Sequence, residues 1–382
     1  MKRLPVCFFA AVVGALMACV GVPAAAEDGF QPMFNGKDLS GWVLTNTPPE
    51  TWSFQDDLLI CSGKPIGEIR TEKMYQNFIM ELEWRHMVPR GNAGVFVWAD
   101  DITARGVPFH RGIEVQVLEN AYGNTQSYTT HGDIFPIHGA KMTPINGRGG
   151  DRAFPTESRA NPSPEWNHYR IECRDGEISL AVNGKVVTQG KEASPSKGYI
   201  CLESEGGVVH FRNIRIQTLP DTDIAPEQIA IANRGYESLY TGLNLTGWAE
   251  PSDSDQWKVN DWTLSHTSAV DQTSRLVSQR SFDRIGFVVD VRLKDDAGKA
   301  SIAIGDQTKF DLADPEIAKH LQKSGQWNRL ELTQVEDKRM LIVNGQPTEV
   351  SQSFVSGPLT LVASGNVDFC NVYARTISVN QP

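Results

Sequence analysis

The sequence has few cations, no polar tract and no long amphipathic helical pattern, and each absence excludes a class of protein. Lys and Arg total 36 against 46 Asp and Glu, and the formal net charge of −10 argues against binding to a nucleic-acid backbone, which needs clustered cations. Hydrophobic residues make up 40% of the chain, so general disorder is excluded. The length of 382 residues predicts two or three domains rather than one small module.

Two cofactor signatures are also missing. No cysteine spacing matches a zinc site, and no strand–glycine–helix unit for a dinucleotide occurs, so no nicotinamide cofactor is expected. Cys173 and Cys201 lie on two strand-like segments of one domain. They could form a disulfide or remain buried free thiols, and the sequence leaves both outcomes open.

The first 26 residues have the pattern of a signal peptide. Lys2 and Arg3 precede an apolar run over 4–22, and small residues at 24–26 fit a cleavage site. We therefore expect an exported protein, either periplasmic or extracellular. A retained membrane anchor and a lipoprotein acylated at Cys19 are the alternatives, and membrane association is expected only in those two cases.

The chain contains an internal repeat. Three motifs recur in the same order, with 34–42 matching 240–248, 166–167 matching 327–328, and 182–184 matching 343–345. Recurrence of this kind indicates two copies of one structural unit. The expected organisation is a domain over 30–219, a linker over 220–235 and a second, degenerate copy over 236–380.

Most segments alternate apolar and polar side chains with the period of a β-strand, as in 78–84. Asn-Gly pairs at 183–184 and 344–345 supply the positive backbone angles of tight hairpins. The expected fold class is therefore all-β, with one two-sheet sandwich in each copy.

The second copy is shorter by 45 residues, and the loss falls opposite residues 101–165 of the first copy. Such a long irregular segment inside a sandwich is usually functional or disordered, so chemistry is expected in the first copy. Within it, Glu114 and Gln116 share one face of a strand, and Glu119 joins that face only if a bulge follows Gln116. The spacing resembles the Glu-x-Asp-x-x-Glu strand of glycoside hydrolase family 16, a jelly-roll family of retaining enzymes. A solvated strand face is the structural alternative.

A broader resemblance covers nearly all of the first copy. The motifs at 34–42, 91–96, 113–118, 165–167 and 209–214 resemble, in this order, the 3-keto-disaccharide hydrolase domain. The resemblance implies a concanavalin A-like jelly roll that acts on glycosides oxidised at C3. A base then removes the C2 hydrogen, the C1 aglycon leaves and water adds back.

This resemblance directs the choice of candidate residues. The candidate catalytic residues are Glu114, Glu119, His131 and Asp133. The candidate substrate-binding residues are Arg85, Asn92, Trp98, Gln116, His138 and Lys141. If a divalent metal ion is bound, the candidate ligands are Glu114 and Glu203.

We expect a specific role for most of these residues, and an ordinary structural side chain is the alternative for each. Glu114 is expected as the base or a metal ligand, and Glu119 as the acid if the bulge exists. His131 and Asp133 would face one way on an extended segment and orient an acid or base, or bind a cation. Trp98 would stack on a sugar ring.

The sequence therefore predicts an exported carbohydrate-active protein whose first copy hydrolyses or eliminates 3-keto-glycosides. The second copy is expected to be catalytically silent, because it lacks the candidate site residues. The alternatives are a lectin-like module that binds glycans without catalysis, and a family-16-like retaining β-glucanase. The expected partner is a carbohydrate, and the oligomeric state is left open.

Overall fold

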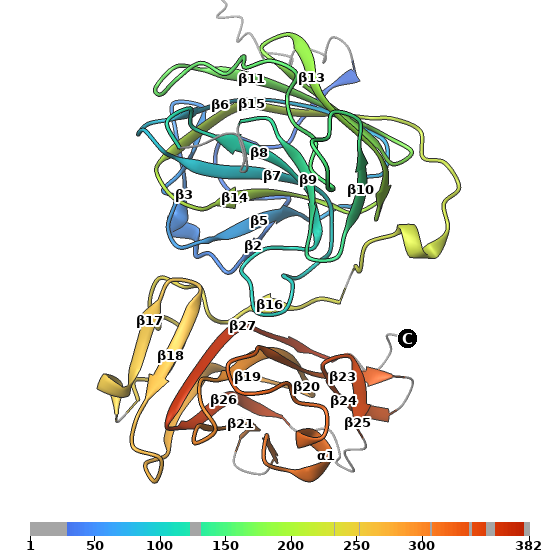
Figure 1. Cartoon of the computed structure of the whole chain (residues 1–382). Helices are drawn as coiled ribbons and strands as arrows, with labels where there is room; N and C mark the ends of the chain where they lie inside the picture. Colours follow the sequence, from blue (N-terminus) through green and yellow to red (C-terminus); the bar gives the residue numbers. More distant parts are fainter. Residues whose placement is uncertain are drawn as a thin grey trace, which may run out of the picture.

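The computed structural model of the chain consists of two β-sandwiches that follow one another in sequence (Figure 1). The described residues are 29–122, 131–232, 234–251, 253–305, 308–335, 338–348 and 356–377. The expected signal peptide and Cys19 lie outside these residues. Strands dominate both sandwiches, so the prediction of an all-β fold is confirmed.

Two antiparallel sheets form the first sandwich, and we call them the back sheet and the front sheet. The back sheet has the order β10-β13-β12-β11-β6-β15-β4-β3, and β1 also pairs with β15. Its strands are β1 Gln31–Pro32, β3 Trp52–Gln55, β4 Leu58–Cys61, β6 Phe78–His86, β10 Lys141–Pro144, β11 Asn167–Arg174, β12 Glu177–Val182, β13 Lys185–Ser194 and β15 Val209–Thr218.

The front sheet has six strands in the order β2-β5-β14-β7-β8-β9. Its strands are β2 Trp42–Thr45, β5 Gly67–Thr71, β7 Asn92–Ala99, β8 Gly112–Leu118, β9 Ile134–Ile137 and β14 Tyr199–Ser204. The predicted motif strand is β8, which lies between β7 and β9.

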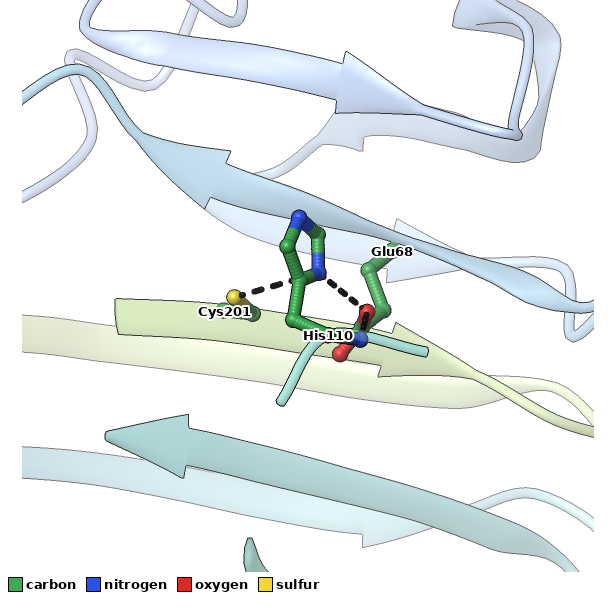
Figure 2. Close-up of side chains that lie close together, drawn as sticks. All are labelled: Glu68, His110 and Cys201. Atoms are coloured by element: carbon green, nitrogen blue, oxygen red, sulfur yellow. Dashed lines mark hydrogen bonds and ion pairs between the residues drawn. The ribbon is translucent and has the colours of Figure 1, made fainter. Parts of the chain in front are cut away.

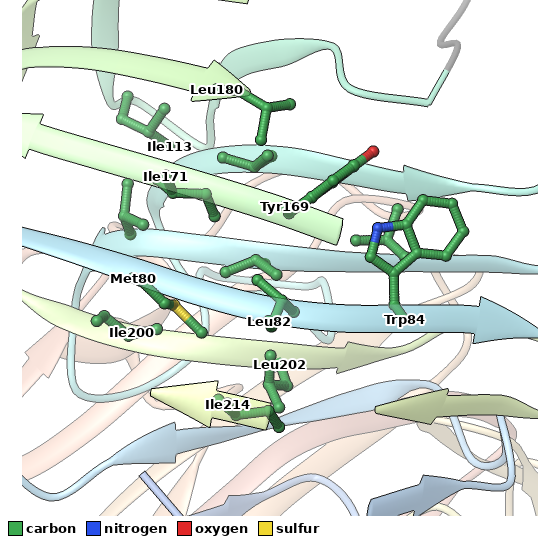
Figure 3. Packing of buried hydrophobic residues seen from close by; sticks show 14 of the residues in the cluster. Met80, Leu82, Trp84, Ile113, Tyr169, Ile171, Leu180, Ile200, Leu202 and Ile214 are labelled. Carbon is green, nitrogen blue, oxygen red and sulfur yellow. The ribbon is translucent and has the colours of Figure 1, made fainter. Parts of the chain in front are cut away.

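The core of the first sandwich lies between the two sheets. In β8, Ile113, Val115 and Val117 are fully buried in this core. Because side chains alternate along a strand, Glu114 and Gln116 project from the opposite, outer face of the front sheet. Figure 3 shows Ile113 near side chains of the back sheet within this core.

The second sandwich repeats the first with fewer strands. Its larger sheet has the order β17-β18-β27-β20-β23-β24-β25, with β16 paired to β27, and its smaller sheet has the order β19-β26-β21-β22. Its strands are β16 Glu237–Ser238, β17 Trp257–Asn260, β18 Thr263–Thr267, β19 Ser274–Phe282, β20 Ile285–Leu293, β21 Lys299–Ile304, β22 Thr308–Asp311, β23 Asn328–Val335, β24 Lys338–Val343, β25 Gln346–Thr348, β26 Gly357–Ser364 and β27 Asn366–Thr376.

The two sandwiches correspond strand by strand along their larger sheets. The order β17-β18-β27-β20-β23-β24-β25 reproduces β3-β4-β15-β6-β11-β12-β13 of the back sheet. Strand β22 pairs with β21 as β8 pairs with β7. Between β22 and β23, in the part that the structure describes, no strand takes the place of β9 or β10. The shorter repeat therefore lacks strands next to the position of β8.

Both predicted hairpins form at the Asn-Gly pairs. Asn183 and Gly184 join β12 to β13 with φ angles of 47° and 85°. Asn344 and Gly345 join β24 to β25 with φ angles of 52° and 83°. Two successive positive φ angles match the twist of the flanking strands, which explains the choice of Asn-Gly at both turns.

Helices are few and short. They are the 3-10 helices η2 Pro49–Thr51, η3 Pro226–Gln228 and η4 Ser254–Gln256, and the α-helix α1 Pro315–Ala318. Among the described residues, no helix has the length and apolar character needed to cross a membrane.

The loop over residues 100–111, which we call the interface loop, joins β7 to β8 and contacts the second sandwich. Gly106 donates its backbone N–H to Asp290 at 2.8 Å, and the guanidinium of Arg329 holds the same carboxylate at 2.7 and 2.8 Å. Asn371 donates to two backbone carbonyls of the loop, both at 2.9 Å. The second sandwich therefore fixes the chain segment that leads into β8.

Cys173 and Cys201 are buried free thiols rather than a disulfide. Cys173 lies on β11 of the back sheet and packs in the core. Cys201 lies on β14 of the front sheet. On the outer face of this sheet it belongs to a separate apolar cluster with Phe96 and Tyr199. The thickness of the front sheet thus separates the two sulfur atoms.

Candidate functional site

Four glutamates gather on the outer face of the front sheet, and we call them the carboxylate cluster. Glu68 on β5 and Glu203 on β14 are direct partners in the strand register. Glu114 projects from the same face of β8, and Glu205 follows the end of β14. Glu203 is 1% exposed and Glu114 7% exposed, whereas Glu205 is half-buried. Glu205 is therefore the member of the cluster most open to solvent.

Gly94 on β7 makes room between two of these carboxylates. A Cβ atom at this position would lie 2.9 Å from Oε2 of Glu203 and 3.1 Å from Oε1 of Glu114. Glu114 and Glu203, the two candidate metal ligands, therefore approach the same point on the sheet face. The absence of a side chain at Gly94 allows the two acids to approach from β14 and β8.

Side-chain amides connect the cluster to the motif strand. Gln116 donates through Nε2 to Oδ1 of Asn92 at 2.8 Å and to the backbone oxygen of Ala93 at 3.2 Å. Asn92 in turn donates through Nδ2 to a carboxylate oxygen of Glu205. The expected substrate-binding residues Asn92 and Gln116 thus lie beside the cluster, and Asn92 orients the Glu205 carboxylate.

The environment raises the pKa of Glu114, Glu203 and Glu205. Burial, followed by the charge of Glu205, holds the pKa of Glu114 well above its ordinary value. Burial, followed by the charges of Glu205 and Glu114, does the same to the pKa of Glu203. Burial and the charge of Glu68 raise the pKa of Glu205 to about 7, although the hydrogen bond from Asn92 opposes the rise. Strongly raised pKa values in a group of acids are typical of a functional site.

Arg152 brings a positive charge to the edge of the cluster. Its guanidinium carbon lies 3.4 Å from the ring centre of Phe135, which is the register partner of Glu114 across β8 and β9. Arg152 also forms an ion pair with Asp133 at 3.1 Å. Its charge opposes the rise in the pKa of Glu114.

The expected bulge after Gln116 is absent, so the predicted catalytic role of Glu119 is wrong. Strands β7 and β8 pair residue for residue from Asn92–Leu118 to Val97–Ile113. Glu119 accepts backbone N–H groups of Arg90 at 2.8 Å, Ala121 at 2.7 Å and Ser163 at 3.2 Å.

These contacts assign Glu119 to the structure of the adjoining loops. The regular register also removes the second carboxylate on which the resemblance to family 16 depended. The prediction of a family-16-like pair on this strand is therefore wrong.

His131 and Asp133 contact different partners. Nε2 of His131 lies 3.3 Å from Oγ of Ser158, and the charge of Glu119 acts on this histidine. Asp133 instead pairs with Arg152 beside Glu114. Of this expected pair, the structure brings only Asp133 next to the carboxylate cluster.

Two expected substrate-binding residues lie away from the cluster. Arg85 is on the outer face of the back sheet, where its guanidinium stacks on Trp166 at 4.5 Å. Trp98 is completely buried in the core and donates its indole N–H to the backbone oxygen of Gln76 at 2.9 Å. A sugar cannot stack on a ring without exposed surface, so the predicted role of Trp98 is wrong. The predicted role of Arg85 is also wrong, because this side chain lies on the back sheet and the cluster lies on the front sheet.

His138 and Lys141 flank a turn between the two sheets. His138 follows β9, and its ring stacks on Phe109 of the interface loop with a centre-to-centre distance of 6.5 Å. Lys141 is exposed on β10, where it pairs in register with Ser194 of the back sheet. The lysine therefore lies on a different sheet from the cluster, and its expected role in binding substrate is not supported by this position.

One group of three ligating side chains in the described part of the chain is close enough to hold a metal ion. It consists of Glu68, His110 and Cys201, whose ligand atoms all lie within 4.8 Å of one another (Figure 2). The expected pair of Glu114 and Glu203 is not part of this group. A bound divalent metal ion stays a prediction.

Sequence reasoning did not select four residues of the site, namely Glu68, His110, Arg152 and Glu205. Sequence reasoning selects Glu203 but not Glu205, although both lie on the short run 198–206. Period-two alternation after Cys201 places 203 and 205 on one side, and this signal could have identified Glu205. No local pattern marks the other three, because they come from β5 and from two loops.

The corresponding face of the second sandwich has different residues. Strand β22, the counterpart of β8, carries Lys309 and Asp311, which form an exposed ion pair at 2.7 Å. Among the described strands of the two smaller sheets, only those of the first sandwich carry the carboxylate cluster. This difference agrees with the expectation that chemistry is confined to the first copy.

A family model described as the 3-keto-alpha-glucoside-1,2-lyase-like domain matches residues 29–217. The first domain of this chain belongs to that family. We call it the lyase-like domain below. The match includes every residue of the carboxylate cluster and ends before the second sandwich.

Several solved structures are similar to this chain over about half of its length. Two candidate glycosyl hydrolases from Parabacteroides distasonis are 24% and 26% identical, cover 50% of this chain and 94% and 99% of their own, and give TM-scores of 0.40 and 0.39. The carbohydrate-binding module CBM66 from Bacillus subtilis is 11% identical over 47% of this chain and 96% of its own, with a TM-score of 0.33. No curated protein matches the chain.

Proposed function

We propose that the lyase-like domain is a carbohydrate-active enzyme that cleaves glycosides carrying a ketone at C3, and that the protein is exported. The family supports the substrate class. The observation that carries the proposal is the pair of Glu114 and Glu205, two carboxylates with raised pKa values and unequal burial on one sheet face.

The chemistry sets the requirements for the site. A ketone at C3 acidifies the hydrogen on C2, so a general base can remove that proton while an acid protonates the C1 oxygen as the aglycon leaves. Water then adds to the resulting double bond and gives the free 3-keto sugar. The negative charge that develops on the C3 oxygen needs hydrogen-bond donors or a cation.

Unequal burial separates the two acids into complementary roles. Glu114 is the more deeply buried, and burial holds its pKa well above the ordinary value, so we assign it the role of the acid. Glu205 is more open and has a pKa of about 7, so a large fraction is ionised and can accept the C2 proton. This assignment replaces the base role that the sequence suggested for Glu114.

Neighbouring groups supply the remaining functions. The amides of Asn92 and Gln116 can each donate to and accept from sugar hydroxyls, and Asn92 holds Glu205 in place. Arg152 is the cation beside Glu114, and it is the candidate for stabilising the enediolate.

The test compares matched disaccharides that differ only in the C3 ketone. Wild type is expected to release the aglycon from the keto sugar alone, and Glu114→Gln and Glu205→Gln should each lower kcat by about 10²–10⁴-fold. Glu83→Gln is a suitable control, because Glu83 lies on the back sheet and pairs with Arg212. Cleavage of the ordinary disaccharide, or full activity in both variants, would overturn the proposal.

The same experiment separates the enzyme from a lectin-like module. A binding module would give saturable binding of the glycan that Glu114→Gln does not change, and no product on prolonged incubation.

A further inference from the structure

Beside the carboxylate cluster, and sharing Glu68 with it, lies a second set of polar side chains whose histidine and cysteine the proposed reaction does not use. Glu68 comes from β5, Cys201 from β14 and His110 from the interface loop just before β8. All three side chains are completely buried. Figure 2 shows them pointing toward one another from these separate elements.

Both partners of His110 meet the same ring nitrogen. Nδ1 contacts a carboxylate oxygen of Glu68 and lies 3.7 Å from Sγ of Cys201, while the backbone N–H of His110 donates to Glu68 at 2.8 Å. A catalytic relay of thiol, imidazole and carboxylate uses two different ring nitrogens. Burial also raises the pKa of the Cys201 thiol well above its ordinary value, so this cysteine is not an activated nucleophile.

Two polar atoms of this set have no hydrogen-bond partner among the described residues. They are Oε1 of Glu68 and Nε2 of His110, and both belong to side chains with no exposed surface. A buried polar atom without a partner costs about 1–3 kcal/mol. A bound cation would provide the partner that Oε1 of Glu68 lacks.

We propose that Glu68, His110 and Cys201 bind a divalent transition metal ion of the zinc class. One thiolate, one imidazole and one carboxylate are the donors that zinc prefers. With bond lengths of about 2.3 Å to sulfur and 2.1 Å to nitrogen, a tetrahedral ion separates these two donors by about 3.6 Å. The observed distance of 3.7 Å between Sγ and Nδ1 fits this value, whereas the Glu68 carboxylate, which now hydrogen-bonds Nδ1, has to move away from this nitrogen when the ion replaces the shared proton.

Binding has a defined proton balance. The ion takes the place of the proton on Nδ1, the imidazole stays neutral with its proton on Nε2, and the Cys201 thiol loses its proton to solvent. Glu68 coordinates as a carboxylate. Three protein ligands leave the fourth position of a tetrahedral ion for a water or another oxygen donor.

The role of this ion is structural, because its three ligands have no contact with solvent. It links β5, β14 and the interface loop, and so fixes the part of the front sheet that carries the carboxylate cluster. The apolar residues Phe96 and Tyr199 cluster with Cys201 and exclude water from that side. The inference does not depend on the proposed reaction, since a metal ion can be measured without substrate.

Cobalt titration of the full-length, chelator-treated protein tests the site directly. Cobalt(II) bound to a thiolate gives an intense near-ultraviolet charge-transfer band, which should saturate at about one ion per chain. Cys201→Ser should abolish the band. Cys173→Ser removes another completely buried thiol of the same domain and should leave it unchanged. Absence of the band in wild type, or its persistence in Cys201→Ser, would overturn the proposal.

A second variant covers the case in which Cys201→Ser fails to fold. Glu68→Gln preserves the shape and the thiol, and it should weaken cobalt binding at least about tenfold while circular dichroism reports an intact fold. Zinc should also raise the Tm of wild type and have a smaller effect on this variant. Equal cobalt affinity in wild type and Glu68→Gln would contradict the assignment of this ligand.

Discussion

Glu114 and Glu203 approach each other over Gly94, and one carboxylate oxygen of each lies within 3.1 Å of the point that a Cβ on this glycine would occupy. Two acids held so close to one position repel when both are ionised. The glycine therefore determines the spacing of the acids and, through it, their protonation.

Gly94→Ala should reduce activity much more than stability. The new methyl group would meet two carboxylate ends and the ring edge of Phe96 rather than backbone, so we expect a fall of at least about tenfold in kcat/KM with a small change in Tm. Gly112→Ala on β8 is the control, because its Cβ would meet the backbone of Val97 and Ala99. That variant should lose stability but keep its activity per folded molecule. Equal activity loss in the two variants would contradict the importance of the Gly94 gap.

The pH dependence of kcat/KM should show a rising limb near pH 7. Only ionised Glu205 can accept a proton, and its pKa is raised to about 7 by burial and by Glu68, against the hydrogen bond from Asn92. Activity is therefore lost as the pH falls through this value. The other titratable members of the cluster are Glu114 and Glu203, and the charged groups at its edge are Asp133 and Arg152.

Glu205→Gln should remove this limb together with most of the rate. Asn92→Asp provides an independent test, because it replaces a donor to Glu205 by a second negative charge. The midpoint of the limb should then move to higher pH. An unchanged midpoint in Asn92→Asp would argue against Glu205 as the titrating base.

Glu119→Gln should affect stability and leave chemistry intact. Burial alone would raise the pKa of Glu119, but the N–H groups of Arg90, Ala121 and Ser163 outweigh it and lower the pKa. A lowered pKa in the folded state stabilises the fold above the unfolded value of about 4.3 and loses this effect as the pH falls through the folded value.

The Glu119→Gln variant should accordingly unfold about 1–3 kcal/mol more easily at pH 7, with a difference that shrinks below about pH 4. Urea unfolding at both pH values measures this. Glu165→Gln changes an exposed acid nearby and serves as the control. A large loss of kcat in Glu119→Gln with unchanged stability would restore the catalytic interpretation.

Asp290→Asn should loosen the interface loop of the first sandwich although Asp290 lies in the second. Asp290 is completely buried, and its carboxylate forms an ion pair with Arg329 and accepts the backbone N–H of Gly106. Removing one partner of a buried ion pair costs about 3–5 kcal/mol. Hydrogen exchange of residues 103–107 should be faster than in wild type.

The control for this prediction is Asp311→Asn, which removes an exposed ion pair with Lys309 in the same sandwich. It should leave exchange in the interface loop unchanged. Identical exchange in Asp290→Asn and wild type would show that the second sandwich does not hold the loop.

Several features of the fold and site were accessible from sequence because they depend on local chemistry. Alternation along 112–118 correctly placed Glu114 and Gln116 on one face and Val115 on the other. The positive φ angles at Asn183 and Gly184 follow from the same short-range preference.

Other features depend on strand register and on contacts between distant segments. The position of Glu119 required the pairing of β7 with β8, and a shift of one residue reverses the face of every later side chain. The burial of Trp98 likewise depends on its packing in the core and on the carbonyl of Gln76. An aromatic residue on a strand looks the same in sequence whether it faces a ligand or the core.

The sequence by itself determined the all-β class, the hairpin turns and the identity of β8 as the strand with polar residues on one face, because each follows from interactions between near neighbours. Only the tertiary structure decided which acids meet. Glu68, Glu114 and Glu205 come from three separate segments, and their spacing depends on sheet order and on the empty position at Gly94. The raised pKa values of Glu114 and Glu205 follow from burial and from repulsion by neighbouring acids, which exist only after these segments have come together.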